Sequence, residues 1–145
     1  MKDLYLKTLG LIKTVPSIKF ADLDKGQLDN YEVRPALIFP CVLIRLEFPK
    51  TENIGAKQQK VQAQITLRVA FDFVGRTASN TPEPVVEQSL GYFDTMTDLY
   101  KAFQDYYGDG FTRFSRISLR EEKRNDGLKV VNMPFITNLI DKSAV

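Results

Sequence analysis

The chain has 145 residues, 43% of them hydrophobic, and a formal net charge of +2 at neutral pH. This length and composition predict a single globular domain spanning 1–145 and argue against global disorder. A charge so near zero does not by itself call for a nucleic-acid partner. No apolar run reaches the roughly 18 residues that a membrane span requires. Charges also interrupt the first twelve residues too often for a signal-peptide core, so we expect a soluble protein made in the cytoplasm.

The composition removes most catalytic chemistry. The sequence has no histidine and one cysteine, Cys41, which excludes the usual zinc sites and the Ser–His and Cys–His nucleophile pairs within one chain. Asp22, Asp24 and Asp29 do not match the spacing of a calcium loop. The glycines are too scattered for a phosphate-binding loop. We therefore expect no enzyme, no metal and no cofactor, with Cys41 as a small core residue.

The N-terminal part predicts a helix, a short strand and a loop. Leucines spaced among charges over Lys2–Lys13 indicate a short amphipathic helix that ends before Pro16. Ile18–Leu23 has the length and apolar content of a short strand. Asp24–Arg34 is polar and contains Gly26, which predicts a loop.

The next segment predicts the first long strand. Pro35–Phe48 is apolar almost throughout until Arg45, which is typical of a strand covered on both faces at its start. Pro40 has no N–H to donate to a ladder, so we expect a bulge or an edge there. Pro49–Lys57 contains Pro, Asn and Gly and is predicted to be a polar connector. It would join this strand to the following one in an antiparallel hairpin with a long tip.

Gln58–Val74 is the stretch around which the fold is predicted to form. The odd positions from Val61 to Phe73 are all apolar, and the even positions are mostly polar, with Ala70 and Val74 as exceptions. This alternation predicts a strand with one buried face and one wet face. At about 3.3 Å per residue the strand would exceed about 40 Å, far more than a usual strand. It must therefore pair with long neighbours or project from the body as an arm.

A single long helix is predicted over Val85–Tyr107. Pro82 suits a helix start, Asn80 or Thr81 is the candidate cap, and Gly108–Gly110 should end the helix. We expect its apolar stripe to pack on the sheet, the alternative being a partner-binding face. The stripe recurs at three- and four-residue spacing and consists of Val86, Leu90, Phe93, Met96, Leu99, Tyr100, Phe103 and Tyr107.

The C-terminal part predicts a second hairpin. Phe111–Arg124 alternates imperfectly, and Asn125-Asp126-Gly127 provides a strong turn signal before a last strand over Leu128–Ile140. Pro134 should mark an edge or a bulge in that strand. The element order predicts an α+β fold with a mixed, mostly antiparallel sheet of long strands. One long helix would pack on a sheet face, accompanied by the short N-terminal helix.

This second hairpin is basic. Arg113–Lys129 holds six basic and three acidic residues, which is typical of a solvated hairpin but also suits an edge that faces an anion. A small nucleic-acid-binding domain is therefore an alternative function, because aromatic residues interleave with these cations as they do in single-strand binders. The cations concerned are Arg113, Arg116, Arg120, Lys123 and Arg124, near Phe111 and Phe114.

Three stretches of this chain resemble a known family of assembly proteins. They are IKFADLDKGQLDN at Ile18–Asn30, RPALIFPCVLIRLEF at Arg34–Phe48 followed by QQKVQAQITLRVAFDF, and VVNMPFITNLID at Val130–Asp141. In these stretches and in the order of its elements, the chain is similar to the phage tail terminator or tail-completion proteins, which are minor tail proteins. The resemblance implies a non-enzymatic structural protein of a phage or prophage that forms a ring, expected to be a hexamer.

The resemblance also implies partners and a location. Such a ring caps the tail tube, contacts the tail tube protein on one side and head–tail connector proteins on the other, and surrounds DNA that passes transiently through its lumen. The protein would be cytoplasmic during assembly and would reside in the virion tail afterwards, with no membrane contact. We expect subunit contacts at the Pro49–Lys57 tip and the Arg120–Leu128 hairpin. The candidate interface residues are Gln58, Gln62, Gln64, Arg120, Lys123 and Arg124.

Overall fold

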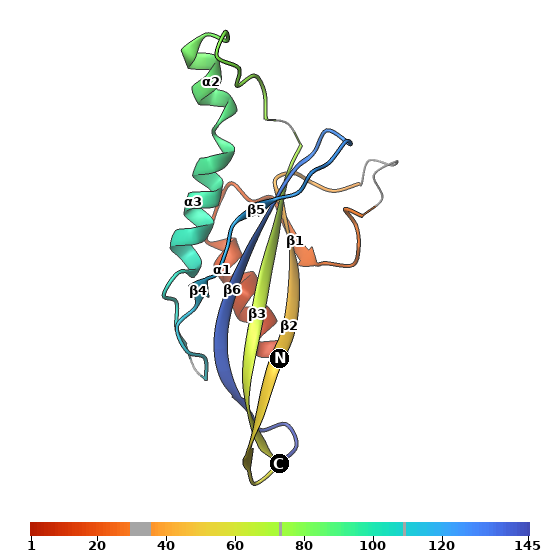
Figure 1. Ribbon diagram of the computed structural model, residues 1–145, viewed down its shortest axis with the longest axis vertical. Helices are drawn as coiled ribbons and strands as arrows, with labels where there is room; N and C mark the ends of the chain where they lie inside the picture. The colour runs from red at the N-terminus through yellow and green to blue at the C-terminus, as the bar shows by residue number, and fades with distance from the viewer. Residues whose placement is uncertain (30–35, 73, 109) are drawn as a thin grey trace.

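The computed structural model describes residues 1–29, 36–72, 74–108 and 110–145. These residues form a six-stranded sheet in the order β1-β2-β3-β6-β4, with β5 also pairing with β6, and helices cover one of its faces (Figure 1). The α+β fold with a mixed sheet is confirmed. The elements in chain order are α1 (Lys2–Lys13), β1 (Phe20–Leu23), β2 (Cys41–Gly55), β3 (Gln58–Phe71), α2 (Glu83–Ser89), α3 (Tyr92–Phe103), β4 (Ser115–Arg116), β5 (Arg120–Glu121) and β6 (Lys129–Asp141).

Three long antiparallel strands form the centre of the sheet. β2 pairs with β3 along most of its length, from Cys41 opposite Ala70 to Gly55 opposite Gln58. β6 pairs with the other edge of β3, from Gln59 opposite Asp141 to Phe71 opposite Lys129. β1 runs parallel to the start of β2, which makes the sheet mixed. The central strand thus has the long neighbours that its length requires.

The expected bounds of the first long strand are wrong at both ends. β2 begins at Cys41, immediately after Pro40, so this proline precedes the ladder and no bulge is needed there. The predicted connector Pro49–Lys57 is mostly strand, because Pro49 is accommodated in a bulge between Glu47 and Lys50, where the register with β3 shifts. The predicted start at Pro35 and the loop residues 30–34 lie outside the described residues.

The main core lies between the sheet and the helices. The odd-numbered residues of β3 from Val61 to Phe71 are buried against it, as the alternation predicts. α1 contributes Leu4 and Ile12, and α3 contributes its buried stripe of Met96, Leu99 and Phe103. Each such side chain stabilises the fold by about 1.5–3 kcal/mol when it leaves water. The short N-terminal helix is confirmed with its expected bounds.

The prediction of a wet second face holds only for the first half of β3. Thr66, Arg68 and Ala70 are buried although they occupy even positions. A second, smaller core covers this end of the face and includes Leu28 from the β1–β2 connection and Leu128 from the β5–β6 hairpin. Ala70, an apolar exception in the alternation, lies in that second core.

The long helix is present but interrupted. α2 and α3 are separated at Leu90 and Gly91, where the amide of Gly91 donates to the carbonyl of Gln88 and hydrogen bonds tighten to three-residue spacing. The expected cap is wrong: the N-cap of α2 is Pro82, and it makes no side-chain hydrogen bond. α3 ends at Phe103 rather than Tyr107, because Gln104 is already extended and Asp105 has φ of 60°. Asp109, within the predicted terminator, lies outside the described residues.

The C-terminal hairpin is confirmed, with a shorter first arm than expected. In the stretch 111–124, β4 and β5 pair with β6 on either side of Pro134, and Phe111 adds a single bridge to Leu139. The carbonyl of Pro134 accepts a hydrogen bond from Ile117 across this gap. In a strand the N–H and C=O of one residue point to the same side. The missing N–H of Pro134 therefore faces the interruption between β4 and β5, which is how the ladder tolerates a proline there.

Candidate functional site

The lower end of the three central strands extends beyond the helices as an arm, which comprises residues 50–60 and 140–142 (Figure 1). Residues 50–57 are all exposed, as are Gln59 and Lys60, so neither face of the sheet is covered here. Ile54, 51% exposed, and Ile140, 45% exposed, are the large apolar side chains that the arm shows to solvent. A strand of this length is expected either to pair with long neighbours or to project as an arm, and β3 does both (Figure 1).

The tip of the arm is a two-residue turn with unusual residues. Ala56 and Lys57 have φ of 52° and 59°, and Gly55 has φ of 90°. Two-residue hairpin loops that need positive φ at both positions strongly prefer Asn-Gly. An L-residue in this left-handed region costs about 1–2 kcal/mol. The ladder of β2 and β3 therefore holds a turn that its own sequence does not favour.

The three candidate glutamines lie along the open face of β3. Gln58 is half-buried at the base of the tip turn, opposite Gly55. Gln62 lies between Lys50 and Asn138 and lines a shallow pocket of about 110 Å³ with Glu52 and Lys60. Gln64, one step further up, makes only a long contact of 3.5 Å from its Nε2 to Oγ1 of Thr66. These amides have hydrogen-bonding capacity left for a partner.

The upper half of the same face holds a buried ion-pair network around Arg68. The guanidinium of Arg68 donates to both carboxylate oxygens of Glu122, at 2.9 and 2.6 Å. Its Nη1 lies 2.8 Å from Asp29 and 3.5 Å from Asp24, and its side chain is only 4% exposed. Burial alone would lower the pKa of Arg68, but the hydrogen bonds that it donates to Glu122 and Asp29 outweigh this effect and raise the pKa. The network ties β3 to the loop after β1 and to the C-terminal hairpin.

Arg124 belongs to this network and not to an exposed surface. Its side chain is 1% exposed and donates to Asp126 at 2.6 Å and to the carbonyl of Leu28 at 2.5 Å. The Arg124 hydrogen bonds are the main reason why the pKa of Asp126 lies below its usual value. The predicted subunit contact of Arg124 stays a prediction, but its position explains the residue as a support of the hairpin.

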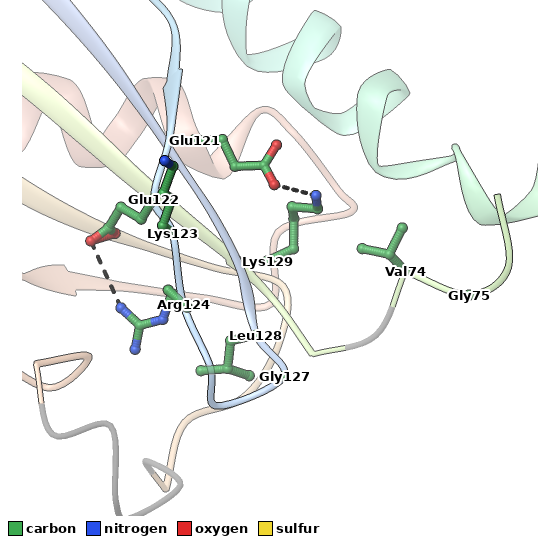
Figure 2. A pocket seen from close by; sticks show the side chains of 9 residues that line it. All are labelled: Val74, Gly75, Glu121, Glu122, Lys123, Arg124, Gly127, Leu128 and Lys129. Atoms are coloured by element: carbon green, nitrogen blue, oxygen red, sulfur yellow. Dashed lines mark hydrogen bonds and ion pairs between the residues drawn. The ribbon is translucent and has the colours of Figure 1, made fainter. Parts of the chain in front are cut away.

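Arg120 and Lys123, the other two basic candidates, are exposed on the hairpin. Lys123 lines a broad surface pocket of about 740 Å³ between the β5–β6 hairpin and Val74–Gly75 (Figure 2). The same wall carries Glu121, which pairs with Lys129, and Glu122, which pairs with Arg68 and Arg124. Cations and carboxylates alternate around the opening, so the pocket has no single sign of charge.

Two further cations of the basic segment have partners within the chain. Arg116 stacks over the ring of Tyr100 at 4.0 Å, and Arg113 stacks over Tyr107 at 4.3 Å while donating to the carbonyl of Asp105. These contacts orient the guanidinium groups along α3 and the segment that follows it. Together with Arg124, they account for three of the five cations that favour a nucleic-acid interface in the sequence.

Two features of the described residues bear on reactive chemistry. Cys41 is fully buried, and burial raises the pKa of its thiol to about 11, which leaves it protonated and unreactive at neutral pH. Within the described ranges, no group of three or more Cys, Asp or Glu side chains is placed to hold a metal ion. The carboxylates around Arg68 serve a guanidinium and not a cation from solution.

The sequence matches no family model, and no curated protein matches it significantly. Among the helices of the described residues, none is long and apolar enough to cross a membrane.

The Arg68 network is the feature that sequence reasoning missed. Its members lie far apart in the sequence: Arg68 and Glu122 have a sequence separation of 54. A signal was present, because Ala70 breaks the polar pattern two residues after Arg68 and lies on the same face. An apolar residue there indicates that the end of the face is covered. A covered arginine then requires carboxylates near it.

Proposed function

We propose that this protein is a non-enzymatic assembly protein of the phage tail terminator or tail-completion type, in which copies of the chain form a ring. The exposed arm is the structural feature that best supports the proposal. It extends the sheet beyond its helical cover, is polar on both faces and exposes Ile54 and Ile140 at its end.

An arm of this kind contributes little to the fold of one chain. A β-hairpin that buries no apolar face is at best marginally stable in water, and residues 50–60 lie outside both cores. The arm does, however, hold backbone edges, amides and two exposed isoleucines well away from the body. Such a surface is useful when a second protein covers it, as subunits do in a ring.

The partners follow from the same proposal. The ring would be a hexamer that contacts the tail tube protein on one side and the head–tail connector proteins on the other, with DNA passing through its lumen. Assembly would take place in the cytoplasm and the ring would remain in the virion tail, of an active phage or of a prophage. The polar open face around Gln62 and Gln64 is the sheet surface best suited to a neighbour.

Shortening the arm tests the proposal. Glu52 and Lys60 are cross-strand partners, so residues 53–59 can be replaced by Asn-Gly to close a shorter hairpin at that pair. The variant should fold, with the melting temperature of the parent to within a few degrees, and should sediment as a monomer where the parent forms rings visible by electron microscopy.

Ala56→Asn is the matched control, because it alters the turn and keeps the arm. Its rings should equal those of the parent. A parent protein that stays monomeric up to its solubility limit, alone and with tail tubes, contradicts the proposal. Rings that form equally well without residues 53–59 would remove the arm as its basis.

No specific observation in the described part of the structure favours the alternative function, nucleic-acid binding. Arg116 and Arg124 are engaged within the chain, and Arg113 is exposed but stacks on Tyr107. Arg120 and Lys123 are exposed, and the described residues show no such contact for them. Two cations give a shallow salt dependence, whereas backbone binders neutralise many phosphates. Retention on heparin at low salt that disappears in Arg120→Ser/Lys123→Ser would revive this alternative.

A further inference from the structure

The upper end of the molecule carries an acidic, partly apolar surface, called here the acidic helical end. It consists of Glu83, Glu87, Asp94 and Asp98 with Val85, Leu90 and Phe93, all exposed between the start of α2 and the middle of α3. Phe93 is 51% exposed although its ring stacks on Tyr92 at 4.3 Å. α2 projects above the body at the end of the molecule opposite to the arm (Figure 1).

The arm carries the opposite charge. Lys50, Lys57, Lys60 and Lys142 lie on it, against the two carboxylates Glu52 and Asp141. Its exposed isoleucines lie among these lysines, as Leu90 and Phe93 lie among the acids. Each end of the molecule therefore combines exposed apolar side chains with a net charge opposite in sign to that of the other end.

Helix stability does not explain all of the acids. Glu83 and Asp94 lie in the first turns of α2 and α3, where the helix dipole favours a carboxylate. Glu87 and Asp98 lie four residues further on, and like charges at this spacing destabilise a helix. Lys101, three residues after Asp98 on α3, offsets part of this repulsion for Asp98. A cation from outside the chain would offset it for both acids.

We propose that the arm of one copy docks on the acidic helical end of the next copy. This contact rests on the proposed function and specifies which surfaces join the subunits. It uses two different surfaces of the chain, which gives head-to-tail assembly and not a two-fold dimer. We favour a second copy of the protein as the partner, because the basic arm and the acidic helical end belong to the same molecule. They lie at its opposite ends, so the arm of one copy can reach the helical end of another.

The chemistry of the two surfaces indicates which side chains would meet in this contact. Lysines of the arm face Glu87 and Asp98, and the isoleucines pack on Leu90 and Phe93. Exposed charge pairs of this kind steer association and fix register more than they add affinity. The apolar side chains supply the buried area, and raised salt should weaken assembly without abolishing it.

Charge reversal tests the pairing. Glu87→Lys/Asp98→Lys reverses the two acids that would face the arm and brings the net charge of the helical end to zero. Lys57→Glu/Lys142→Glu makes the arm acidic, with both lysines outside the paired strands. Each double variant should keep its melting temperature to within a few degrees and should need at least a tenfold higher concentration than the parent to assemble in sedimentation velocity.

An equimolar mixture of the two double variants gives the decisive result. In the mixture, the unaltered basic arm of one variant can dock on the unaltered acidic helical end of the other. The altered arm of the second variant can likewise dock on the altered helical end of the first. Assembly should return with the two variants alternating, which permits only even-membered rings. The quadruple variant should assemble on its own for the same reason.

Lys2→Glu/Lys13→Glu on α1 is the matched control, since it changes the net charge by the same amount on another surface. It should assemble like the parent. Assembly of the parent together with unaffected double variants, or double variants that do not recover on mixing, overturns this contact and leaves the ring proposal standing. A parent that never assembles overturns both.

Discussion

At the scale of single residues, Arg68 decides how the upper half of the sheet is built. A buried arginine is tolerated only where its charge is paired and its donors are bonded. Here Glu122 accepts two hydrogen bonds, and Asp24 and Asp29 contact the remaining amino group. The loop after β1 and the C-terminal hairpin are thereby fixed to β3 at one point. Three segments distant in the sequence share a single electrostatic support.

Arg68→Met should lower the free energy of unfolding by about 3–5 kcal/mol, because it removes a buried cation partner of Glu122 and Asp24, two largely buried carboxylates. Arg45→Met serves as control: Arg45 is about half exposed and pairs with Asp24 at 3.2 Å, so its loss should cost less than about 1 kcal/mol. Urea unfolding measures both. If Arg68→Met prevents folding, Arg68→Lys, which keeps the charge and loses the paired geometry, should fold with an intermediate stability. Equal stabilities for Arg68→Met and Arg45→Met would refute the assigned role.

Asp126 should contribute to acid denaturation. Its pKa is lowered in the folded state from an ordinary value of 3.8, chiefly by the hydrogen bonds from Arg124. A depressed pKa means that the folded state binds fewer protons, so its stabilisation is complete above pH 3.8 and is lost as the pH falls further. In urea unfolding between pH 6 and 2.5, Asp126→Asn should show a smaller loss of stability than the parent. An unchanged slope would show that the ion pair with Arg124 does not form in solution.

At the scale of elements, period-two alternation predicted β3 well and its neighbours less well. The odd residues from Val61 to Phe71 point to the helices because the pleat requires it. The bounds of β2 could not be read in the same way. Pro49 and Gly55 are strong turn signals locally, but a ladder of long strands outweighs them through a bulge and a tight turn. The break between α2 and α3 is a similar case, because Gly91 interrupts a pattern that otherwise continues.

The turn at the arm tip should be improvable. Ala56→Asn/Lys57→Gly places the favoured residue pair where φ is 52° and 59°. The free energy of unfolding should rise by about 1 kcal/mol, since the left-handed conformations become less strained. Thermal melting measures the gain. Ala56→Val/Lys57→Val, with β-branched residues at the same positions, should have the opposite effect. A turn that tolerates valine as well as Asn-Gly would indicate a different conformation in solution.

At the scale of the whole molecule, the two halves of the sheet differ in how far their faces are covered. The upper half of β3, from Ile65 to Phe71, is buried on both faces, and the arm is open on both. The sequence predicted the sheet and one helical layer because both depend on local periodicity. It did not predict the second cover, because that depends on contacts between the β1–β2 connection and the C-terminal hairpin. The candidate glutamines were placed correctly on the open face, while Arg124 turned out to be internal.

Amide hydrogen exchange should divide the molecule along the same line. Amides of β3 between Ile65 and Phe71 should exchange only through global unfolding, whereas those between Gln58 and Lys60 should exchange through local opening and at least a hundredfold faster. Mass spectrometry of peptic fragments measures the difference. Uniform protection along β3 in a monomeric sample would show that the arm is as stable as the body.

The bulge at Pro49 has a geometric consequence for any polymer of this chain. An extra residue in one strand bends it and increases its local twist, so the bulge between Glu47 and Lys50 sets the angle at which the arm leaves the body. If each arm seats on the following molecule, that angle is repeated at every step. Removing the extra residue would change the rotation that relates one subunit to the next. The subunits would then form an open spiral in place of a closed ring, although every contact between neighbours is kept.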